Sequence, residues 1–341
     1  MKRAWFLGPL LLLVAGAKAP LPAASISAQP PAAIEASAPD AINLPASAPR
    51  AIAQNAQSAP LDIQTKVELL NPGAAPRQQL RFTPPAKTRQ NSKITMRMDM
   101  TAVQGQQRRS ISPPPMVMTI ATEVTKVETN GDIHLRLAYT GADVLPDANT
   151  PAPFIAAMRN YLKTLVGLQN TFVIDSSGSL KKVTNINLPA SLDPNAKRLL
   201  EQISSSLQQI TAPIPKEAVG VGAKWRTTQD ITFNGIALTQ VTLYEIVNLQ
   251  GNVVMLKAAI QQQAQPQELR LPGQPAQFSL NLRKLSSQGN TLSTIRLDRV
   301  MPTSVKASIN TNSQMTARDT RSGQSTNVET TAAIKMTLDP Q

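Results

Sequence analysis

Hydrophobic and polar side chains alternate with a period of two along much of the chain after residue 63. In the segment 93–100, Ile94, Met96, Met98 and Met100 share one face, and Lys93, Thr95, Arg97 and Asp99 share the other. Successive side chains of a β-strand point to opposite faces of its sheet, so this pattern predicts a strand buried on one side.

Two β-hairpins are predicted in the first half of the chain. One strand begins at Met116, includes Ile120 and runs to Val127; after the turn signal Asn130-Gly131, the residues Ile133, Leu135, Leu137 and Tyr139 alternate on the return strand. Asn-Gly between alternating runs is typical of a two-residue hairpin turn. The second hairpin joins segments 171–175 and 180–184 through a Ser-Ser-Gly turn.

Two amphipathic helices are expected between the strands. An apolar stripe with helical spacing is formed by Phe154, Met158, Tyr161, Leu165 and Leu168. The second helix begins at Asp193-Pro194, an N-cap followed by proline at the first helical position, and its stripe is Leu199 or Leu200, Ile203, Leu207 and Ile210.

The C-terminal part returns to strands separated by turn signals. The expected strands are 225–233, 236–247, 253–260, 278–285, 291–300, 304–314 and 328–338, with Gly289-Asn290 as one of the turns between them. Sequential strands with short connections form antiparallel sheets. The fold class expected is mainly β (α+β): a strongly curved antiparallel sheet or half-barrel of about ten strands, whose concave face the two helices cover.

The N-terminus predicts export. Lys2 and Arg3 precede an apolar run, residues 5–15, of the length of a signal-peptide core, and small residues follow. We expect a cleaved secretory signal peptide within residues 1–28, with cleavage between 19 and 28; an uncleaved N-terminal anchor is the alternative. The expected location is periplasmic or extracellular. No later stretch of the sequence is long and apolar enough to suggest a membrane-spanning helix.

The composition divides the remaining chain into two parts. Residues 29–63 are rich in Ala, Pro, Ser and Gln and contain no aromatic residue, so they are expected to form a disordered tether. Residues 64–341 are expected to form a single β-rich domain. With no cysteine in the chain, this domain has no disulfide and must depend on its own core.

The residue types available argue against catalysis. The chain has no cysteine and one histidine, His134, which excludes thiol nucleophiles and leaves a Ser-His-Asp triad only one base. No carboxylate pair, phosphate-binding loop or metal-ligand cluster stands out, so no catalytic residue, metal or cofactor is assigned. His134 shares the polar face of its strand and is expected to be solvated.

The charge and the methionines suggest binding partners. The formal net charge is +13, so an anionic envelope surface is a possible partner, with general solubility as the alternative role for this charge. Nucleic acid is not expected, because the protein is exported and lacks aromatic stacking platforms. The eleven methionines could line an adaptable apolar pocket or fill an ordinary core. Candidate ligand-binding residues are Met96, Met98, Ile120, Leu135, Leu137 and Trp225.

Two segments carry a resemblance to known families. The hairpin 172–180 and the sequence Val219-Gly220-Val221-Gly222-Ala223-Lys224-Trp225 resemble an uncharacterised family of secreted bacterial domains, over residues 64–341. The order of strands and helices is also similar to the lipoprotein-carrier half-barrel superfamily. That resemblance implies a concave apolar surface that receives acyl chains, and it assigns no catalytic residue.

Three functions follow as hypotheses. The first is an exported envelope protein that binds an apolar or amphipathic ligand, such as an acyl chain, a lipid or a lipoprotein. The second is a structural or interaction protein that contacts envelope proteins and whose core is filled. The third is a hydrolase.

Overall fold

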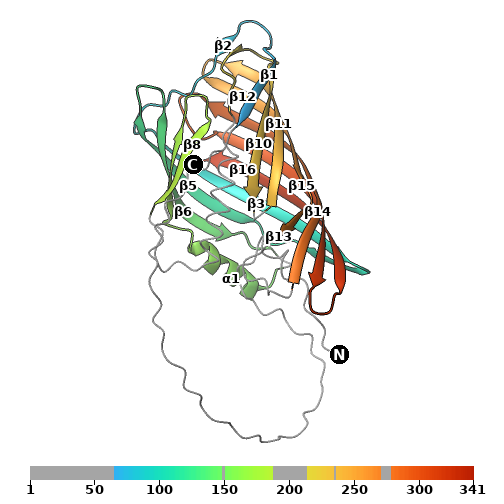
Figure 1. The fold of residues 1–341 in the computed structure, drawn as a ribbon. Coiled ribbons are helices and arrows are strands. Elements are labelled where there is room, and N and C mark those ends of the chain that lie inside the picture. Colours follow the sequence, from blue (N-terminus) through green and yellow to red (C-terminus); the bar gives the residue numbers. More distant parts are fainter. Residues whose placement is uncertain (1–64, 148–149, 187–212, 234–235, 270–277) are drawn as a thin grey trace, which may run out of the picture.

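A computed structural model describes residues 65–147, 150–186, 213–233, 236–269 and 278–341. The expected signal peptide, the expected tether and the second expected helix lie outside the described residues. Within them the protein is mainly β, with one helix, one large antiparallel sheet and a separate sheet of two short strands (Figure 1).

The described elements include the expected strands and the first expected helix, together with short strands that the sequence did not predict. The first half contains β1 (Lys66–Asn71), β2 (Gln78–Gln79), β3 (Arg89–Gln104), β4 (Gln107–Ile111), β5 (Met116–Val127), β6 (Ile133–Val144), α1 (Ala152–Lys163), β7 (Gln169–Ile174) and β8 (Leu180–Ile186). The second half contains β9 (Ala218–Val219), β10 (Lys224–Phe233), β11 (Ile236–Gln250), β12 (Val253–Ala264), β13 (Gln267–Leu269), β14 (Phe278–Arg296), β15 (Ser304–Asp319) and β16 (Ser325–Pro340).

The large sheet has 14 strands, and its main path runs β1-β10-β11-β12-β14-β15-β16-β3-β5-β6-β7-β8. The predicted antiparallel topology and both hairpins are confirmed. The C-terminal strand β16 lies in the interior of the sheet, because it pairs with β15 on one side and with β3 on the other. This pairing joins the two halves of the chain in one sheet.

The half-barrel prediction is corrected. The strands at the two ends, β1 and β8, do not pair with each other, and the sheet is not strongly curled (Figure 1). The prediction assumed that curvature was needed to bury two helical stripes. Segments 72–88 and 213–223, which contain the paired short strands β2 and β9, instead contribute buried residues to the core, among them Leu80, Ile214 and Ala223.

Hydrogen bonds of these segments link distant parts of the sheet. The indole Nε1 of Trp225 in β10 donates to the carbonyl of Pro213 at 2.9 Å. The next residue, Ile214, donates its backbone N–H to Ser177 in the turn after β7, also at 2.9 Å. Phe82 donates to the neighbouring carbonyl of Ser176 at 2.8 Å. The two ends of the sheet are therefore connected through loops rather than through strand pairing.

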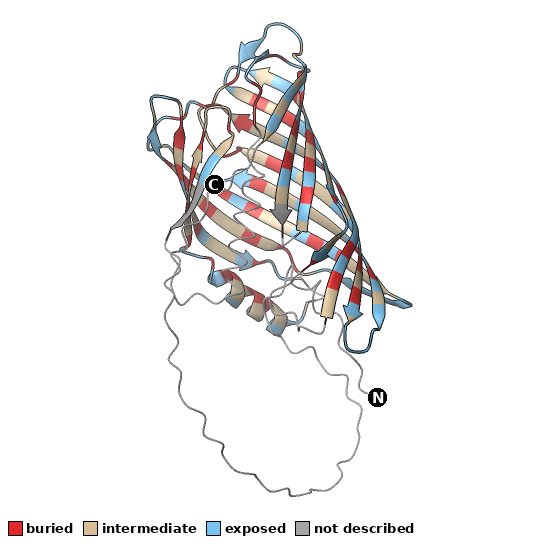
Figure 2. Ribbon diagram, in the orientation of Figure 1, coloured by how far each residue is buried: buried red, intermediate tan, exposed pale blue. Residues whose placement is uncertain are grey.

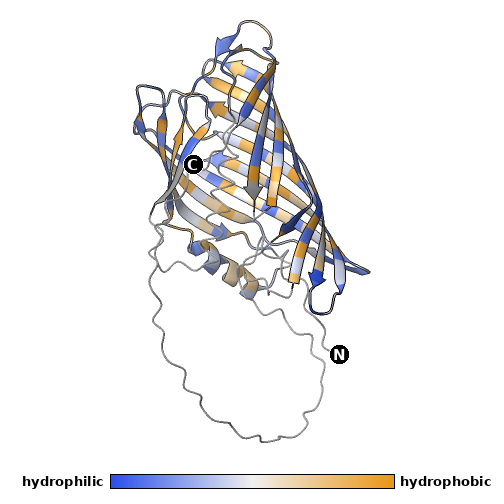
Figure 3. Ribbon diagram, in the orientation of Figure 1, coloured by the Kyte–Doolittle hydropathy of each residue, from blue (hydrophilic) through white to orange (hydrophobic). Residues whose placement is uncertain are grey.

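Apolar and polar residues alternate along the strands, as Figures 2 and 3 show. We call the face that carries Ile94, Ile120, Leu135 and Trp225 the core face. These four residues belong to one large cluster of buried side chains with contributions from both ends of the sheet. A second, smaller cluster is separate from it and lies on β11 to β15. It is formed by Leu238, Ala264, Leu269, Leu280, Leu282, Met315 and Ala317.

Helix α1 confirms the first predicted helix and corrects its buried stripe. The helix ends at Lys163, and its buried residues are Ile155, Met158 and Leu162. Leu165 and Leu168 are buried as well, but they lie in the turn after the helix. The prediction placed Leu165 and Leu168 in the helix because their spacing continues the helical pattern past Lys163, where the helix ends.

The predicted turn at Gly289-Asn290 is wrong. Both residues lie inside β14, a strand of 19 residues that the prediction divided into two. A side chain at Gly289 would place its Cβ 2.8 Å from Cγ1 of Ile309 and 2.8 Å from the carbonyl oxygen of Ser308. This glycine therefore serves close packing between β14 and β15 rather than a turn.

We expect Gly289→Ala to lower the free energy of unfolding by roughly 1–3 kcal/mol, because the new methyl group must displace strand β15. Gly141→Ala is the matched control, since its Cβ would meet Thr119 at an ordinary 3.5 Å. Urea denaturation of the two variants measures the difference. Equal effects would show that Ile309 does not require a glycine opposite it.

Candidate functional site

A row of apolar side chains crosses the core face between the two buried clusters. Met98, Ile334, Ile309 and Ile260 lie in register on β3, β16, β15 and β12, with Gly289 between the last two. We call these four apolar residues the central row. None of them belongs to either cluster, and the three isoleucines are only partly buried. Met98 is buried, so the three isoleucines are the apolar surface of the central row that the described core does not absorb.

A row of polar residues runs beside the central row, two positions along each strand. It consists of Gln229, Gln240, Gln262, Ser287 and Thr311, which lie in register on β10, β11, β12, β14 and β15. We call this set the polar row. Gln229, Gln240 and Ser287 are buried, and Gln262 and Thr311 are partly buried.

Hydrogen bonds satisfy part of the polar row. The amide of Gln262 donates to Oε1 of Gln240 at 2.7 Å, and the amide of Gln229 donates to Oγ1 of Thr65 at 2.6 Å. The hydroxyls of Ser287 and Thr311 lie 2.8 Å apart. Amides and hydroxyls both donate and accept, so this row offers paired hydrogen-bonding groups without any charge.

A buried threonine hydroxyl lies next to the polar row. Thr330 in β16 is opposite Ser313 in β15, one inward-facing position beyond Thr311. The side chain is 6% exposed, and its Oγ1 has no hydrogen-bond partner. A buried hydroxyl without a partner costs free energy, so its retention calls for an explanation.

An aromatic pair lies on β10 and β11, the two strands that also carry Gln229 and Gln240 of the polar row. The rings of Trp225 and Tyr244 stack with centroids 5.1 Å apart, and Trp225 is fully buried. Burial raises the pKa of the Tyr244 phenol to about 12, and hydrogen bonds with Thr227 and Thr242 act in the opposite direction. The phenol therefore stays neutral and extends the set of uncharged polar groups.

The sequence-predicted binding residues fall into two groups. Ile120, Leu135, Leu137 and Trp225 pack inside the large buried cluster. Met98 belongs to the central row, and Met96 is a neighbouring residue of the same face that is only partly buried. The structure therefore leaves the two methionines, and not the other four residues, outside both clusters, with Met98 buried and Met96 partly buried.

The candidate residues predicted from the sequence do not include Ile260, Ile309, Ile334 or any residue of the polar row. A signal was present, because Gln240 and Thr242 occupy the same alternating phase as Leu238. Polar residues in the apolar phase of a half-buried strand mark a polar patch on the buried face. That signal becomes visible as a row only after the register of several strands is known.

His134 lies in an ion-pair group on the polar face of β5 and β6. Its Nε2 is 2.9 Å from Oε1 of Glu128, which also accepts a hydrogen bond from Lys126. These two hydrogen bonds, that of Lys126 first, lower the pKa of Glu128. The side chain of His134 is 34% exposed, in agreement with a solvated strand residue.

Three cations gather on the face opposite the core. Arg97 in β3 lies directly opposite Lys335 in β16, and Lys306 lies on the next strand, β15. All three are exposed, and no ion pair among the described residues includes them. We call these residues the basic cluster. Leu292, which pairs with Lys306 in the sheet, is 45% exposed.

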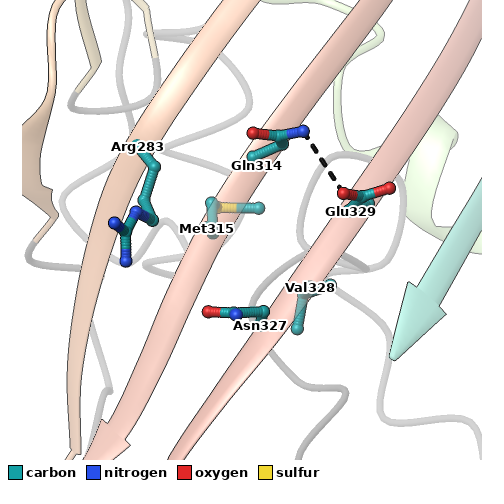
Figure 4. Close-up of a pocket in the computed structure, with 6 residues that line it drawn as sticks. All are labelled: Arg283, Gln314, Met315, Asn327, Val328 and Glu329. Carbon is teal, nitrogen blue, oxygen red and sulfur yellow. Dashed lines mark hydrogen bonds between the residues drawn. The ribbon is translucent and has the colours of Figure 1, made fainter. Parts of the chain in front are cut away.

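A small pocket lies over β14, β15 and β16 (Figure 4). It has a volume of about 200 Å³ and is lined by Arg283, Gln314, Met315, Asn327, Val328 and Glu329. The amide of Gln314 donates to Oε1 of Glu329 at 3.2 Å. This volume is below that of a typical small-molecule site, so the pocket does not define the functional site.

The described residues offer neither a metal site nor a membrane-spanning helix. No group of three or more His, Asp or Glu side chains is arranged to hold a metal ion in this part of the chain. Nor does any helix within it have the length and apolar character needed to cross a membrane.

We expect the stability of the protein to fall between pH 10 and pH 12 partly through Tyr244. The folded-state pKa lies above the unfolded value of 10, so neutral Tyr244 stabilises the fold fully below pH 10, and this contribution is lost as pH rises toward 12. Tyr244→Phe should remove a decline on the order of 2 kcal/mol from the pH dependence measured by urea denaturation. An unchanged slope in the variant would contradict the burial of this phenol.

Comparisons with known proteins do not assign a family. No family model and no curated protein sequence matches the chain. Among solved structures, OmpT, an outer membrane protein of Vibrio cholerae folded in vitro and in trimer form, aligns with 74% of this chain and 100% of its own. The identity is 7% and the TM-score is 0.16, which do not show a shared fold.

Proposed function

We propose that the protein is an exported cell-envelope protein that binds an apolar or amphipathic ligand, such as an acyl chain, on the core face of its sheet. The observation that carries this proposal is the central row. Its isoleucines are partly exposed in the interior of a large sheet, where side chains would otherwise be absorbed by the core. Contiguous exposed apolar surface is a common sign of a binding site.

Energetics favour an acyl chain as the occupant. Each methylene group that leaves water contributes about 0.8 kcal/mol, so a chain that covers the central row can reach micromolar affinity. Isoleucine and methionine side chains offer apolar contact without directional demands. The methionines add adaptability, because their unbranched side chains can fill irregular gaps.

The filled-core interaction protein is the principal alternative. It is favoured by the complete burial of Ile120 and Trp225 and the near-complete burial of Leu135 and Leu137, which leaves these four residues no contact with a ligand. Under this alternative the central row is also covered in the free protein and does not bind acyl chains. The two functions therefore differ in whether the central row of the free protein is open to a ligand.

We expect the purified protein to bind a fluorescent fatty-acyl probe with micromolar affinity, and Ile334→Asp to weaken that binding at least tenfold. The new carboxylate would lie on the partly exposed central row and repel the apolar chain. Ala333→Asp is the matched control, because the adjacent residue points to the opposite face of β16. Fluorescence titration and thermal unfolding are measured for both variants.

Two results would contradict the ligand-binding proposal. One is the absence of probe binding to the wild-type protein. The other is a variant Ile334→Asp that unfolds while Ala333→Asp does not, because this would place Ile334 in a sealed core.

A second candidate function is attachment to an anionic phospholipid surface through the basic cluster. Like charges directly opposite on neighbouring strands destabilise a sheet, yet Arg97 and Lys335 occupy such positions. An anionic headgroup layer would offset that repulsion. The exposed Leu292 beside Lys306 provides apolar contact of the kind that interfacial sites use.

We expect vesicles that contain phosphatidylglycerol, but not pure phosphatidylcholine vesicles, to bind the protein in a salt-dependent manner. The triple variant R97Q/K306Q/K335Q should bind about a hundredfold more weakly, since each cation near the surface contributes about 1 kcal/mol. Lys224→Gln is the control, because Lys224 is 3.8 Å from Glu245. Cosedimentation that the triple variant does not alter would exclude this attachment site.

A further inference from the structure

We propose that the polar row binds the uncharged polar group of the amphipathic ligand, so that the protein prefers neutral acyl esters or amides to ionised fatty acids. This inference rests on the proposed function and specifies the class of its ligand. It starts from the juxtaposition of the polar row with the central row on one face.

The first step is the chemistry of the polar row. Its five side chains are three amides and two hydroxyls, and none of them carries a charge. An ester or amide carbonyl can accept hydrogen bonds from such groups at little cost. A carboxylate placed on the same groups would lose its hydration without meeting an opposite charge, and that loss is expensive.

The second step is the unused hydrogen-bonding capacity at this place. Thr330 is 6% exposed, and its hydroxyl has no partner. A buried donor that lacks a partner marks a place where a ligand oxygen would be favoured.

The third step is geometry. Ile260 and Gln262 are neighbours on the core face of β12, and Ile309 and Thr311 are neighbours on the core face of β15. Residues two apart in a strand are separated by about 7 Å. An acyl chain on the central row therefore ends within reach of the polar row, where its linking ester or amide would lie.

The test compares two probes of the same chain length with the full-length protein at pH 8. One is a fluorescently labelled fatty acid, and the other is its methyl ester. We expect the ester to bind at least tenfold more tightly than the ionised acid. The preference should shrink as the pH is lowered and the free acid becomes protonated.

Two variants on the core face should weaken the binding of the ester. Gln262→Leu and Thr330→Val take away hydrogen-bonding groups while they keep similar side-chain size, so the affinity for the ester should fall several-fold. Gln263→Leu and Thr331→Val are the matched controls, because these neighbours are exposed on the opposite face. The controls should keep the wild-type affinity for the ester.

Stability provides an independent readout for Thr330. Its hydroxyl has no partner in the free protein, so Thr330→Val should leave the thermal midpoint unchanged or raise it. A clear decrease would mean that the hydroxyl is already bonded, and it would overturn the assignment of Thr330 to ligand binding.

The outcomes separate the inference from the proposed function. Equal affinity of the wild-type protein for acid and ester would overturn the inference and leave the proposed function intact. Tighter binding of the acid would have the same consequence. Binding of neither probe would overturn both.

Discussion

The pairing of β16 with β3 is the contact on which the rest of this structure depends. It joins Ser92–Gln104 of the first half of the chain to 328–340 of the second in an unbroken antiparallel register. Without it, β5–β8 and β10–β15 would belong to separate sheets. With it, Met98 lies beside Ile334, and residues distant in sequence form one continuous face. The central row exists only because this register is continuous.

That continuity has a consequence for how the core is built. A sheet of this width has more face than one helix can cover, and α1 packs against β6 near one end. Segments 72–88 and 213–223 supply further cover and link the ends of the sheet through Trp225, Pro213 and Ser177. Between the two buried clusters the face carries a partly exposed apolar row and a polar row side by side. An amphipathic ligand matches that arrangement, because it presents the same two kinds of surface.

The opposite face of the sheet has a different composition. Its polar positions are largely Thr, Ser, Asn and Gln, and its cations are placed at intervals among them. Arg97 and Lys335 meet across two strands whose pairing is needed to hold the sheet together. The two strands keep an unbroken register despite the repulsion between these like charges.

The sequence by itself determined the local structure. Strict alternation identified β3, β5 and β6, Asn130-Gly131 marked a hairpin, and the spacing of apolar residues located α1, because these signals depend only on neighbours in the chain. The tertiary structure decided which strands are neighbours, that β14 continues through Gly289, and that Ile120 and Trp225 are core while Met98 lies in the central row. Alternation tells which face a residue occupies but not which residue lies beside it. The polar row is made of single polar residues from five strands, so its existence depends on long-range register that no local pattern encodes.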